Sequence, residues 1–205
     1  TAAIFGNPQY IPINEDHPCD PINPYGRSKL LIEHMLSDYD VAYNLKSVAL
    51  RYFNAAGADA SGLIGERHIP ETHIIPLVLQ AASGRRKDIT IFGNNYSTND
   101  GTCVRDYIHV LDLCDAHLLS LNWLKKGGSS KRYNLGNGNG FSVKDIVNTA
   151  ERVTKNSISI INSSRRVGDP EALVANSELI RKELGWNPKY RDLETIINHA
   201  WQWEL

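Results

Sequence analysis

The sequence predicts an α/β fold, and three observations lead to this expectation. Short apolar runs rich in β-formers alternate along the chain with segments of helical spacing, which is the order found in α/β proteins. Hydrophobic residues make up 41% and charged residues 22% of the 205 residues, an ordinary globular composition with enough chain for a core. No apolar run approaches the ~18 residues of a membrane span. We therefore expect one large or two small α/β domains.

The expected strands are apolar runs that lie between turn-forming residues. They cover residues 1–5 (as the end of a buried strand), 46–53, 89–92, 105–110, 133–135 and 157–161. The expected helices cover residues 24–39, 74–82, 111–124, 142–153, 177–184 and 192–203. Ser142 and Asp145 form the pattern of a capping box, whereas Ser177 and Gly185 are typical of a helix start and stop. Residues 7–24 are expected to form a long ordered loop.

The charge balance excludes two classes of partner. There are 22 Lys and Arg residues against 23 Asp and Glu residues, so the net charge is -1. Such a chain has no overall basic field to hold a nucleic-acid backbone or an anionic membrane. The sequence therefore predicts neither a nucleic-acid partner nor a membrane partner.

The cysteines and histidines favour neither disulfides nor a bound metal. Cys19, Cys103 and Cys114 show no C-x-x-C spacing, and a reducing, cytoplasmic location is expected for three unpaired thiols. The seven histidines form no H-x-x-x-H or H-E-x-x-H pair on a helical face. We therefore expect no metal site.

Three closely spaced glycines resemble a dinucleotide-binding loop only at first sight. Gly136, Gly138 and Gly140 lie between an expected strand and an expected helix. The required G-x-G-x-x-G spacing fails because position 141 is Phe, and Asp145 follows too soon to be the ribose-binding acid. The pattern indicates a tight turn in which Gly permits a positive φ.

The first expected helix begins with a Y-x-x-x-K pattern. Tyr25 and Lys29 are four residues apart, which places both side chains on one helical face. A free phenol has a pKa near ~10, and a fixed cation beside it favours the phenolate and makes it a more useful base. The alternative is an exposed tyrosine beside a solvated lysine.

The order of several motifs identifies a family. P-Y-G-R-S-K, R-Y-F-N-A-A-G-A, I-F-G-N-N-Y, D-G-T-C-V-R-D-Y-I-H-V, Y-N-L-G and R-R-V-G-D follow one another along the chain. Together they resemble the extended short-chain dehydrogenase/reductases and, more narrowly, the UDP-glucose 4-epimerase (UDP-galactose 4-epimerase) family. The resemblance implies the C-terminal part of a Rossmann-type doubly wound sheet plus a smaller α/β substrate-binding domain. Residues 1–54 would be the remainder of the NAD-binding domain. Residues 55–205 would be mainly the UDP-sugar domain, with some segments returning to the Rossmann part.

The resemblance also implies a mechanism with NAD as cofactor and a UDP-hexose as substrate. Tyr25 matches the family's acid/base, Lys29 the residue that lowers its pKa and holds the nicotinamide ribose, and Thr1 the hydroxyl that bridges sugar O4 and the tyrosine. Phe53 matches the residue beside the nicotinamide. The implied reaction is oxidation at C4, rotation of the 4-keto sugar and re-reduction on its other face.

Matching positions assign the UDP-sugar to a larger set of residues. These are Thr1, Asn54, His73, Ile74, Thr90, Ile91, Phe92, Arg105, Arg166, Asp169 and Leu173. The two arginines would hold the diphosphate, Asp169 would accept sugar hydroxyl hydrogen bonds, and residues 90–92 would line the uracil. Taken singly, each has a structural alternative, such as an ion pair between Arg105 and Asp106.

Three departures from the family pattern limit what can be transferred. His73 stands where many members have Asn, and Leu173 is neither the large nor the small residue that influences acceptance of an N-acetylated sugar. The glycine-rich NAD loop is missing, so we expect a chain entered mid-domain and inactive by itself. The resemblance also implies that the full-length parent is a homodimer.

Other functions remain in competition. Related dehydratases carry Asp-Glu directly after the active-site Thr, where this chain has Ala2 and Ala3, so dehydration is disfavoured. A UDP-glucuronate epimerase or decarboxylase keeps the Tyr and Lys and is a weaker competitor. A non-catalytic nucleotide-sugar-binding fragment and a purely structural α/β domain are the remaining alternatives.

Overall fold

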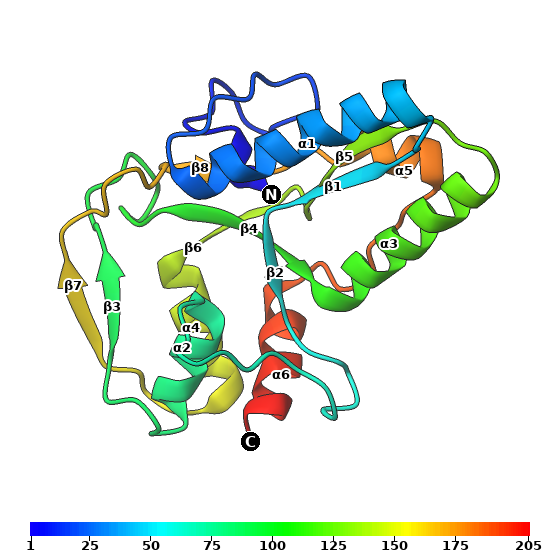
Figure 1. Ribbon diagram of the computed structural model, residues 1–205. Coiled ribbons are helices and arrows are strands. Elements are labelled where there is room, and N and C mark those ends of the chain that lie inside the picture. The colour runs from blue at the N-terminus through cyan, green and yellow to red at the C-terminus, as the bar shows by residue number, and fades with distance from the viewer.

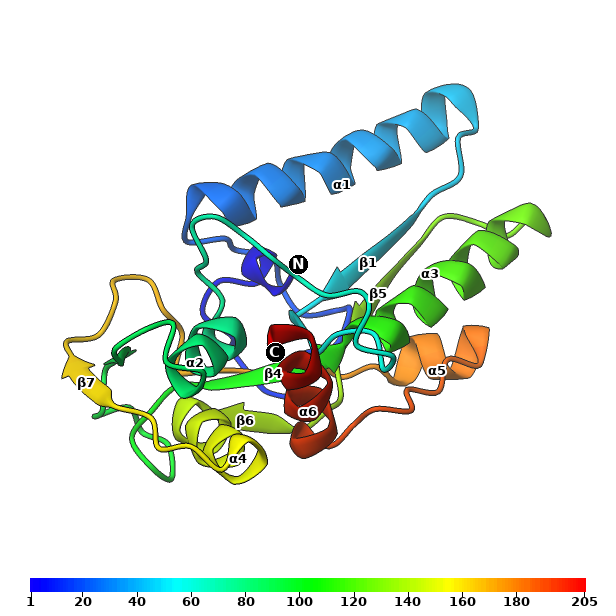
Figure 2. The same cartoon turned by 90° about the horizontal axis from the view of Figure 1, so that it is seen from below.

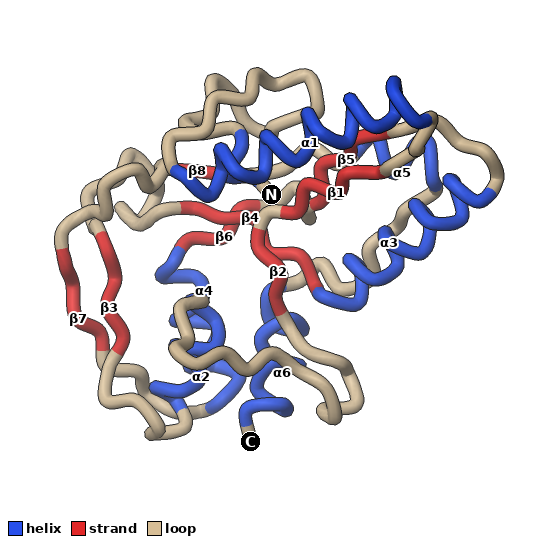
Figure 3. Tube along the Cα trace, viewed as in Figure 1, coloured by secondary structure: helices blue, strands red, loops and turns tan.

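The computed structural model describes residues 1–205 and shows alternating strands and helices (Figures 1 and 3). The helices are the 3-10 turn η1 (Ala2–Ile4) and α1 (Pro24–Tyr43), α2 (Ile74–Ala82), α3 (Val110–Lys125), α4 (Val143–Thr154), α5 (Glu178–Leu184) and α6 (Leu193–Glu204). The strands are β1 (Val48–Tyr52), β2 (Asn54–Ala56), β3 (Ile89–Phe92), β4 (Val104–His109), β5 (Lys131–Leu135), β6 (Gly140–Ser142), β7 (Ile160–Ser163) and β8 (Ala172–Leu173).

Most predicted elements are present, and one is wrong. Residues 1–5 are not the end of a strand but contain the turn η1, in which the Thr1 hydroxyl accepts a hydrogen bond from the amide of Ala3 at 3.3 Å. The apolar run that suggested a strand reflects burial, because Ile4 and Phe5 are fully enclosed. The short strands β2, β6 and β8 were not predicted.

Strand β4 links much of the sheet structure. It pairs in parallel with β2 and β8 and antiparallel with β6, which completes a four-stranded sheet. Strand β1 pairs in parallel with β5, so a segment from the middle of the chain joins one from near its start. Strands β3 and β7 form a third sheet, a parallel pair at the edge of the molecule (Figure 1).

The largest hydrophobic core lies among α2, α4 and α6. These three helices lie together in Figure 2. Their buried side chains pack against those of β3 and against Tyr107 of β4. A second core joins α3 and α5 to β5, and a third encloses the N-terminal turn around Phe5 and Phe53. No helix is both long enough and apolar enough to cross a membrane.

The predicted helix signals had different outcomes. Ser142 and Asp145 form the expected capping box at α4, and Gly185 ends α5 with a φ of 69°. Ser177 was expected to cap α5, but its hydroxyl makes no cap bond. It bonds instead to both the amide and the carbonyl of Gly136, at 2.9 and 3.0 Å. The Ser177 hydroxyl therefore bonds to a residue distant in the sequence instead of to an amide of its own helix.

The glycine turn at residues 136–140 is organised by Asp106. This buried carboxylate accepts backbone hydrogen bonds from Asn137, Gly138 and Ala175 at 2.7, 3.0 and 3.1 Å. Burial raises the pKa of Asp106 to about 6, although the three amides act in the opposite direction. A Cβ at Gly136 would overlap the carboxylate, and Gly138 has a φ of 74°, so the tight-turn interpretation is confirmed.

Candidate active-site cavity

A cavity of about 660 Å³ lies between the start of α1, the strands β2 and β4, and the helices α2 and α6. Six of the residues that the sequence singled out line it. They are Thr1, Tyr25, Phe53, Asn54, His73 and Ile74. The fold thus brings six residues between positions 1 and 74 to one cavity, which their spacing in the sequence does not predict.

The start of helix α1 places Tyr25 at this cavity. The Asn23 side chain caps the helix by accepting a hydrogen bond from the amide of Gly26 at 2.8 Å. Gly26 packs directly on the turn η1, and a Cβ there would overlap the carbonyl oxygen of Ala3. This close approach brings the helix start against the Thr1 segment. The Tyr25 side chain is 56% exposed, so its phenol is accessible to a ligand.

Lys29 lies on the same face of α1 as Tyr25. Its Nζ atom is 5.4 Å from the centroid of the tyrosine ring. The geometry expected for a Y-x-x-x-K pair is therefore present, with the ammonium group over the tyrosine ring.

The floor of the cavity is held by β2 and β4. Asn54 pairs with Tyr107 in the register of these strands, and its side-chain amide donates to the carbonyl of Asp106 at 3.0 Å. This bond fixes the Asn54 side chain and leaves its carbonyl oxygen for a ligand. Phe53 packs against Phe5 with ring centroids 6.3 Å apart. Burial raises the pKa of Tyr107, so its phenol stays neutral.

The remaining predicted residues form a second group beyond the cavity. Arg105 is ion-paired with Asp169, and its side chain is only 12% exposed. The Arg166 guanidinium lies 3.8 Å from the centroid of the Phe92 ring, and Leu173 is opposite Arg105 in the β4–β8 register. The proposed alternative, an Arg105–Asp106 pair, is wrong because Asp106 accepts backbone amides instead.

Strand β4 connects the two groups. Arg105 and Tyr107 are two residues apart, so they face the same side of the strand, and Tyr107 lines the cavity. On β3, Ile91 is buried in the main core while Thr90 and Phe92 are partly exposed. Thr90 and Phe92 can therefore offer side chains to a ligand, whereas Ile91 can offer only its backbone.

Comparison with known proteins assigns the chain to a family. A family profile described as GDP-mannose 4,6 dehydratase matches residues 1–199. The chain belongs to this family. Among curated members, a UDP-glucose 4-epimerase from Halalkalibacterium halodurans is 53% identical over 203 residues, covering 99% of this chain and 61% of the relative. The chain thus spans about three-fifths of the length of this relative.

Solved structures in the family share the fold. The UDP-glucose 4-epimerase from Brucella ovis in complex with NAD is 50% identical, with a TM-score of 0.94 over 97% of this chain and 61% of that one. The enzyme from Bifidobacterium longum in complex with NAD⁺ and UDP is 36% identical, with a TM-score of 0.93 over 100% and 61%. The chain therefore has the Rossmann-type α/β fold that its sequence predicted.

Several cavity residues of this family member were not singled out from the sequence. They include Asp59, Glu66, Tyr107, Cys114 and Trp203. Tyr107 could have been found, because it follows Arg105 by two residues in an expected strand. Trp203 lies at the end of α6 and Glu66 in a loop, where no periodicity indicates which way a side chain faces.

Two histidines lie behind the cavity wall. His109 caps α3 by accepting a hydrogen bond from the amide of Leu111 at Nδ1, so its Nε2 donates to Nδ1 of His199 at 3.0 Å. Burial, and then the neighbouring His199, lower the pKa of His109 to about 4. The ring also packs against Gly57, which lines the cavity. The His109 ring is therefore a neutral support for the wall at neutral pH.

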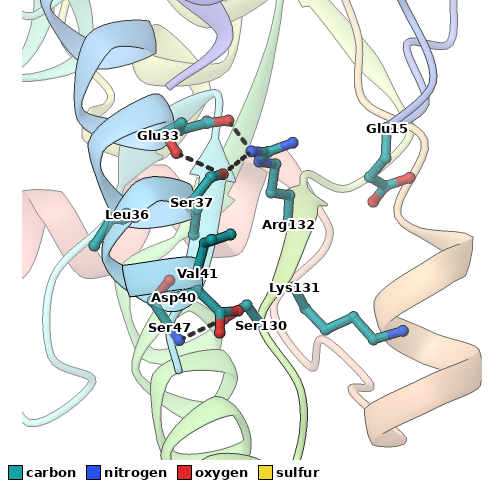
Figure 4. A pocket seen from close by; sticks show the side chains of 11 residues that line it. Glu15, Glu33, Leu36, Ser37, Asp40, Val41, Ser47, Ser130, Lys131 and Arg132 are labelled. Atoms are coloured by element: carbon teal, nitrogen blue, oxygen red, sulfur yellow. Dashed lines mark hydrogen bonds and ion pairs between the residues drawn. The ribbon is translucent and has the colours of Figure 1, made fainter. Parts of the chain in front are cut away.

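A second cavity, of about 460 Å³, lies between α1 and the start of β5 (Figure 4). Glu33 and Ser37 extend from α1 toward Arg132, which contacts them at 3.2 and 2.7 Å. None of the predicted site residues lines this cavity. It is a charged contact region of the helix rather than part of the candidate active site.

Proposed function

We propose that the full-length protein containing this chain interconverts UDP-galactose and UDP-glucose with NAD, through oxidation at C4, rotation of the 4-keto sugar and re-reduction. The observation that carries the proposal is the meeting of Thr1, Tyr25 and Asn54 in one cavity, with Lys29 beside the tyrosine ring. Close relatives that cover nearly the whole chain bear the name UDP-glucose 4-epimerase and support it.

The residues around Tyr25 fit a bound nicotinamide and a sugar. Tyr25 and Phe53 line the cavity, and the ammonium of Lys29 lies beside the tyrosine ring, so polar groups for a ribose and an apolar surface for a ring are both present. When bound, NAD would supply the hydride acceptor and donor. Since this chain has no glycine-rich loop, residues outside it would hold the rest of the dinucleotide.

Tyr25 would move the proton of the sugar O4 hydroxyl. Its phenolate accepts this proton during oxidation and returns it during reduction. The Thr1 hydroxyl would bridge O4 and the phenol, and the ammonium of Lys29, beside the tyrosine ring, would hold the nicotinamide ribose. Thr1 and Tyr25 line the cavity, and Lys29 lies beside the tyrosine ring on α1, which supports these roles.

The second group of residues would bind the nucleotide. Arg105 and Arg166 present guanidinium groups suited to bidentate contacts with a diphosphate, and Asp169 orients Arg105 while offering its other oxygen to a hydroxyl. Thr90, Phe92 and the backbone of Ile91 would line the uracil. Concentrating affinity on the UDP part leaves the hexose free to turn, as re-reduction on the opposite face requires.

The active-site turn argues for epimerisation over dehydration. Ala2 is buried in the N-terminal core, and Ala3 packs against Gly26, so neither offers a carboxylate to C5 of a sugar. A UDP-glucuronate epimerase or decarboxylase keeps the same tyrosine and lysine, and the choice of substrate in an assay separates it from the proposal.

The chain would contribute to two domains of a cytoplasmic homodimer. Pairing of β1 with β5 supports the expected return of a later segment to the Rossmann part. Helix α1 exposes a set of large apolar side chains that would be covered by a second copy. They are Leu31, Ile32, Met35, Tyr39 and Tyr43.

The test of the proposed function uses the full-length protein and Tyr25→Phe. We expect turnover of UDP-galactose to fall by about 100-fold or more, because the proton acceptor is lost, while UDP binding measured by calorimetry is retained. Tyr10→Phe, an exposed tyrosine that does not line the cavity, is the matched control. Full activity in Tyr25→Phe would contradict the mechanism. UDP binding without any turnover in the wild type would instead support a non-catalytic binding protein.

A further inference from the structure

Four ligand-type side chains converge in the loop that precedes α2. The Glu–His cluster consists of Glu66, His68, Glu71 and His73, and one ligand atom from each of these residues lies within 4.8 Å of the other three. The Nδ1 atoms of both histidines point at the same Glu66 oxygen, at 2.6 Å from His68 and 2.7 Å from His73. The Glu71 oxygens lie 3.1 Å from Nδ1 of His73 and 3.9 Å from Nδ1 of His68.

These distances are close to those of a tetrahedral metal site. Ligand atoms about 2.0 Å from a zinc ion at tetrahedral angles lie about 3.3 Å apart. The separations between the histidine nitrogens and the carboxylate oxygens range from 2.6 to 3.9 Å, and one ligand atom from each of the four residues lies within 4.8 Å of the others. Small rotations of the side chains would therefore centre four ligands on one ion.

The chemistry of the donors selects the type of metal. Two imidazole nitrogens with two carboxylate oxygens suit zinc, whereas magnesium and calcium prefer oxygen ligands alone. The His73 side chain is available for this role, because His73 is the N-cap of α2 and makes no side-chain cap bond. Both imidazoles are more than half exposed, so an ion can enter from solvent.

We propose that the Glu–His cluster binds one zinc ion, which holds the loop of residues 57–73 in the wall of the cavity. Four protein ligands leave no open position, so the ion is structural rather than catalytic. Glu66 and His73 both line the cavity. The loop is otherwise held at Trp203, whose indole donates to the Glu66 carbonyl at 2.8 Å and packs against Gly65. The ion would hold the same loop through the side chains of Glu66, His68, Glu71 and His73.

This inference differs from the expectation of no metal site. That expectation rested on the absence of histidines four residues apart on a helix. His68 and His73 are five residues apart and lie in a loop, and the chain path brings their rings within 5.3 Å of each other. The inference does not depend on the proposed epimerase reaction, because it concerns metal binding alone.

Zinc binding is tested on the full-length protein after treatment with a chelator. Titration calorimetry with zinc chloride and metal analysis should give about one Zn²⁺ per chain, and His68→Gln and His73→Asn should each weaken binding by at least about 100-fold. His34→Gln, an exposed histidine on α1, is the matched control and should bind like the wild type. Absence of saturable binding, or equal binding by His68→Gln and His34→Gln, overturns the proposal.

Two further measurements do not rely on the folding of the ligand variants. Cobalt(II) bound to the chelator-treated wild type should show the strong visible absorption of a tetrahedral site, whereas the weak spectrum of the hydrated ion overturns the assignment. Arg67 lies exposed between two of the ligands, so zinc should slow tryptic cleavage there at least several-fold. Zinc binding with an unchanged cleavage rate at Arg67 would overturn the loop-holding role.

Discussion

Arg51 of β1 and Glu33 of α1 form a two-point ion pair inside the protein. The Nε atom of Arg51 lies 2.8 Å from one Glu33 oxygen and its Nη2 atom 2.6 Å from the other, and the two side chains are only 4% and 8% exposed. Arg132 of β5 reaches the same carboxylate at 3.2 Å (Figure 4). One buried carboxylate thus ties the helix that carries Tyr25 to both strands of the β1–β5 pair.

Glu33→Gln should destabilise the protein strongly. Removing one charge of a buried pair leaves the other without compensation, and we expect a loss of about 3–5 kcal/mol in the free energy of unfolding, measured by urea denaturation. Glu194→Gln is the control, since the Arg152–Glu194 pair is exposed with a separation of 3.9 Å and should contribute at most about 1 kcal/mol. Equal losses in the two variants would show that the burial of Glu33 is energetically irrelevant.

Gly26→Ala should impair turnover more than folding. The added methyl group would push the start of α1 away from the Ala3 carbonyl, with an expected cost of about 1–3 kcal/mol in stability. A displacement of Tyr25 relative to Thr1 by about 1 Å should lower kcat about 100-fold. Steady-state kinetics with UDP-galactose measure the effect, and Asp38→Ala, an exposed site on α1, is the control. An unchanged kcat would mean that the close packing at Gly26 does not position Tyr25.

Local signals predicted the helices well, and non-local pairing explains what the sequence did not reveal. Ser142 with Asp145 and Gly185 act within one turn of their own helix, so their effect is visible in a few residues of sequence. Ser177 carries a similar signal, but its hydroxyl bonds to Gly136, a partner 41 residues away. The three-residue strand β2 likewise exists only because β4 lies beside it.

The candidate site shows the same difference between local signals, which the sequence reveals, and non-local contacts, which it does not. The pairing of Tyr25 with Lys29 follows from helical periodicity, and the structure places the ammonium over the ring. The Glu–His cluster is a property of a loop whose path no periodicity describes, so its convergence was visible only in the structure. Resemblance to family motifs, rather than periodicity, singled out residues such as Arg105. Its ion-pair partner Asp169 lies 64 positions away in the sequence.

Arg105→Lys should weaken nucleotide binding. A lysine keeps the charge but loses the planar fork needed for a bidentate contact with a phosphate and for the ion pair with Asp169. We expect UDP affinity of the full-length protein to fall by about 10- to 100-fold, measured by calorimetry, with KM for UDP-galactose rising accordingly. Arg152→Lys, an exposed position on α4, should leave the affinity unchanged. If both variants bind UDP like the wild type, Arg105 is not a diphosphate ligand.

Stability between pH 4 and 7 should reflect two buried groups that act in opposite directions. Burial lowers the pKa of His109 to about 4 from an ordinary value of 6.5, so the unfolded chain takes up a proton in this window while the folded protein does not. This uptake makes the folded state less stable as the pH falls from 6.5 toward 4. Asp106 has a raised pKa of about 6 against an ordinary 3.8, so its contribution favours the folded state at low pH and is lost as the pH rises through 6.

Because these effects oppose each other, the wild-type profile alone does not separate them. His109→Asn keeps a side chain that can cap α3 but removes the titrating ring. The stability advantage of the wild type over this variant, measured by urea denaturation at several pH values, should therefore shrink as the pH falls from 7 to 4. Asp106→Asn removes the other group, and here the wild-type advantage should grow as the pH falls over the same range. A wild-type advantage over His109→Asn that stays constant with pH would show that His109 titrates in the folded protein as it does in the unfolded chain.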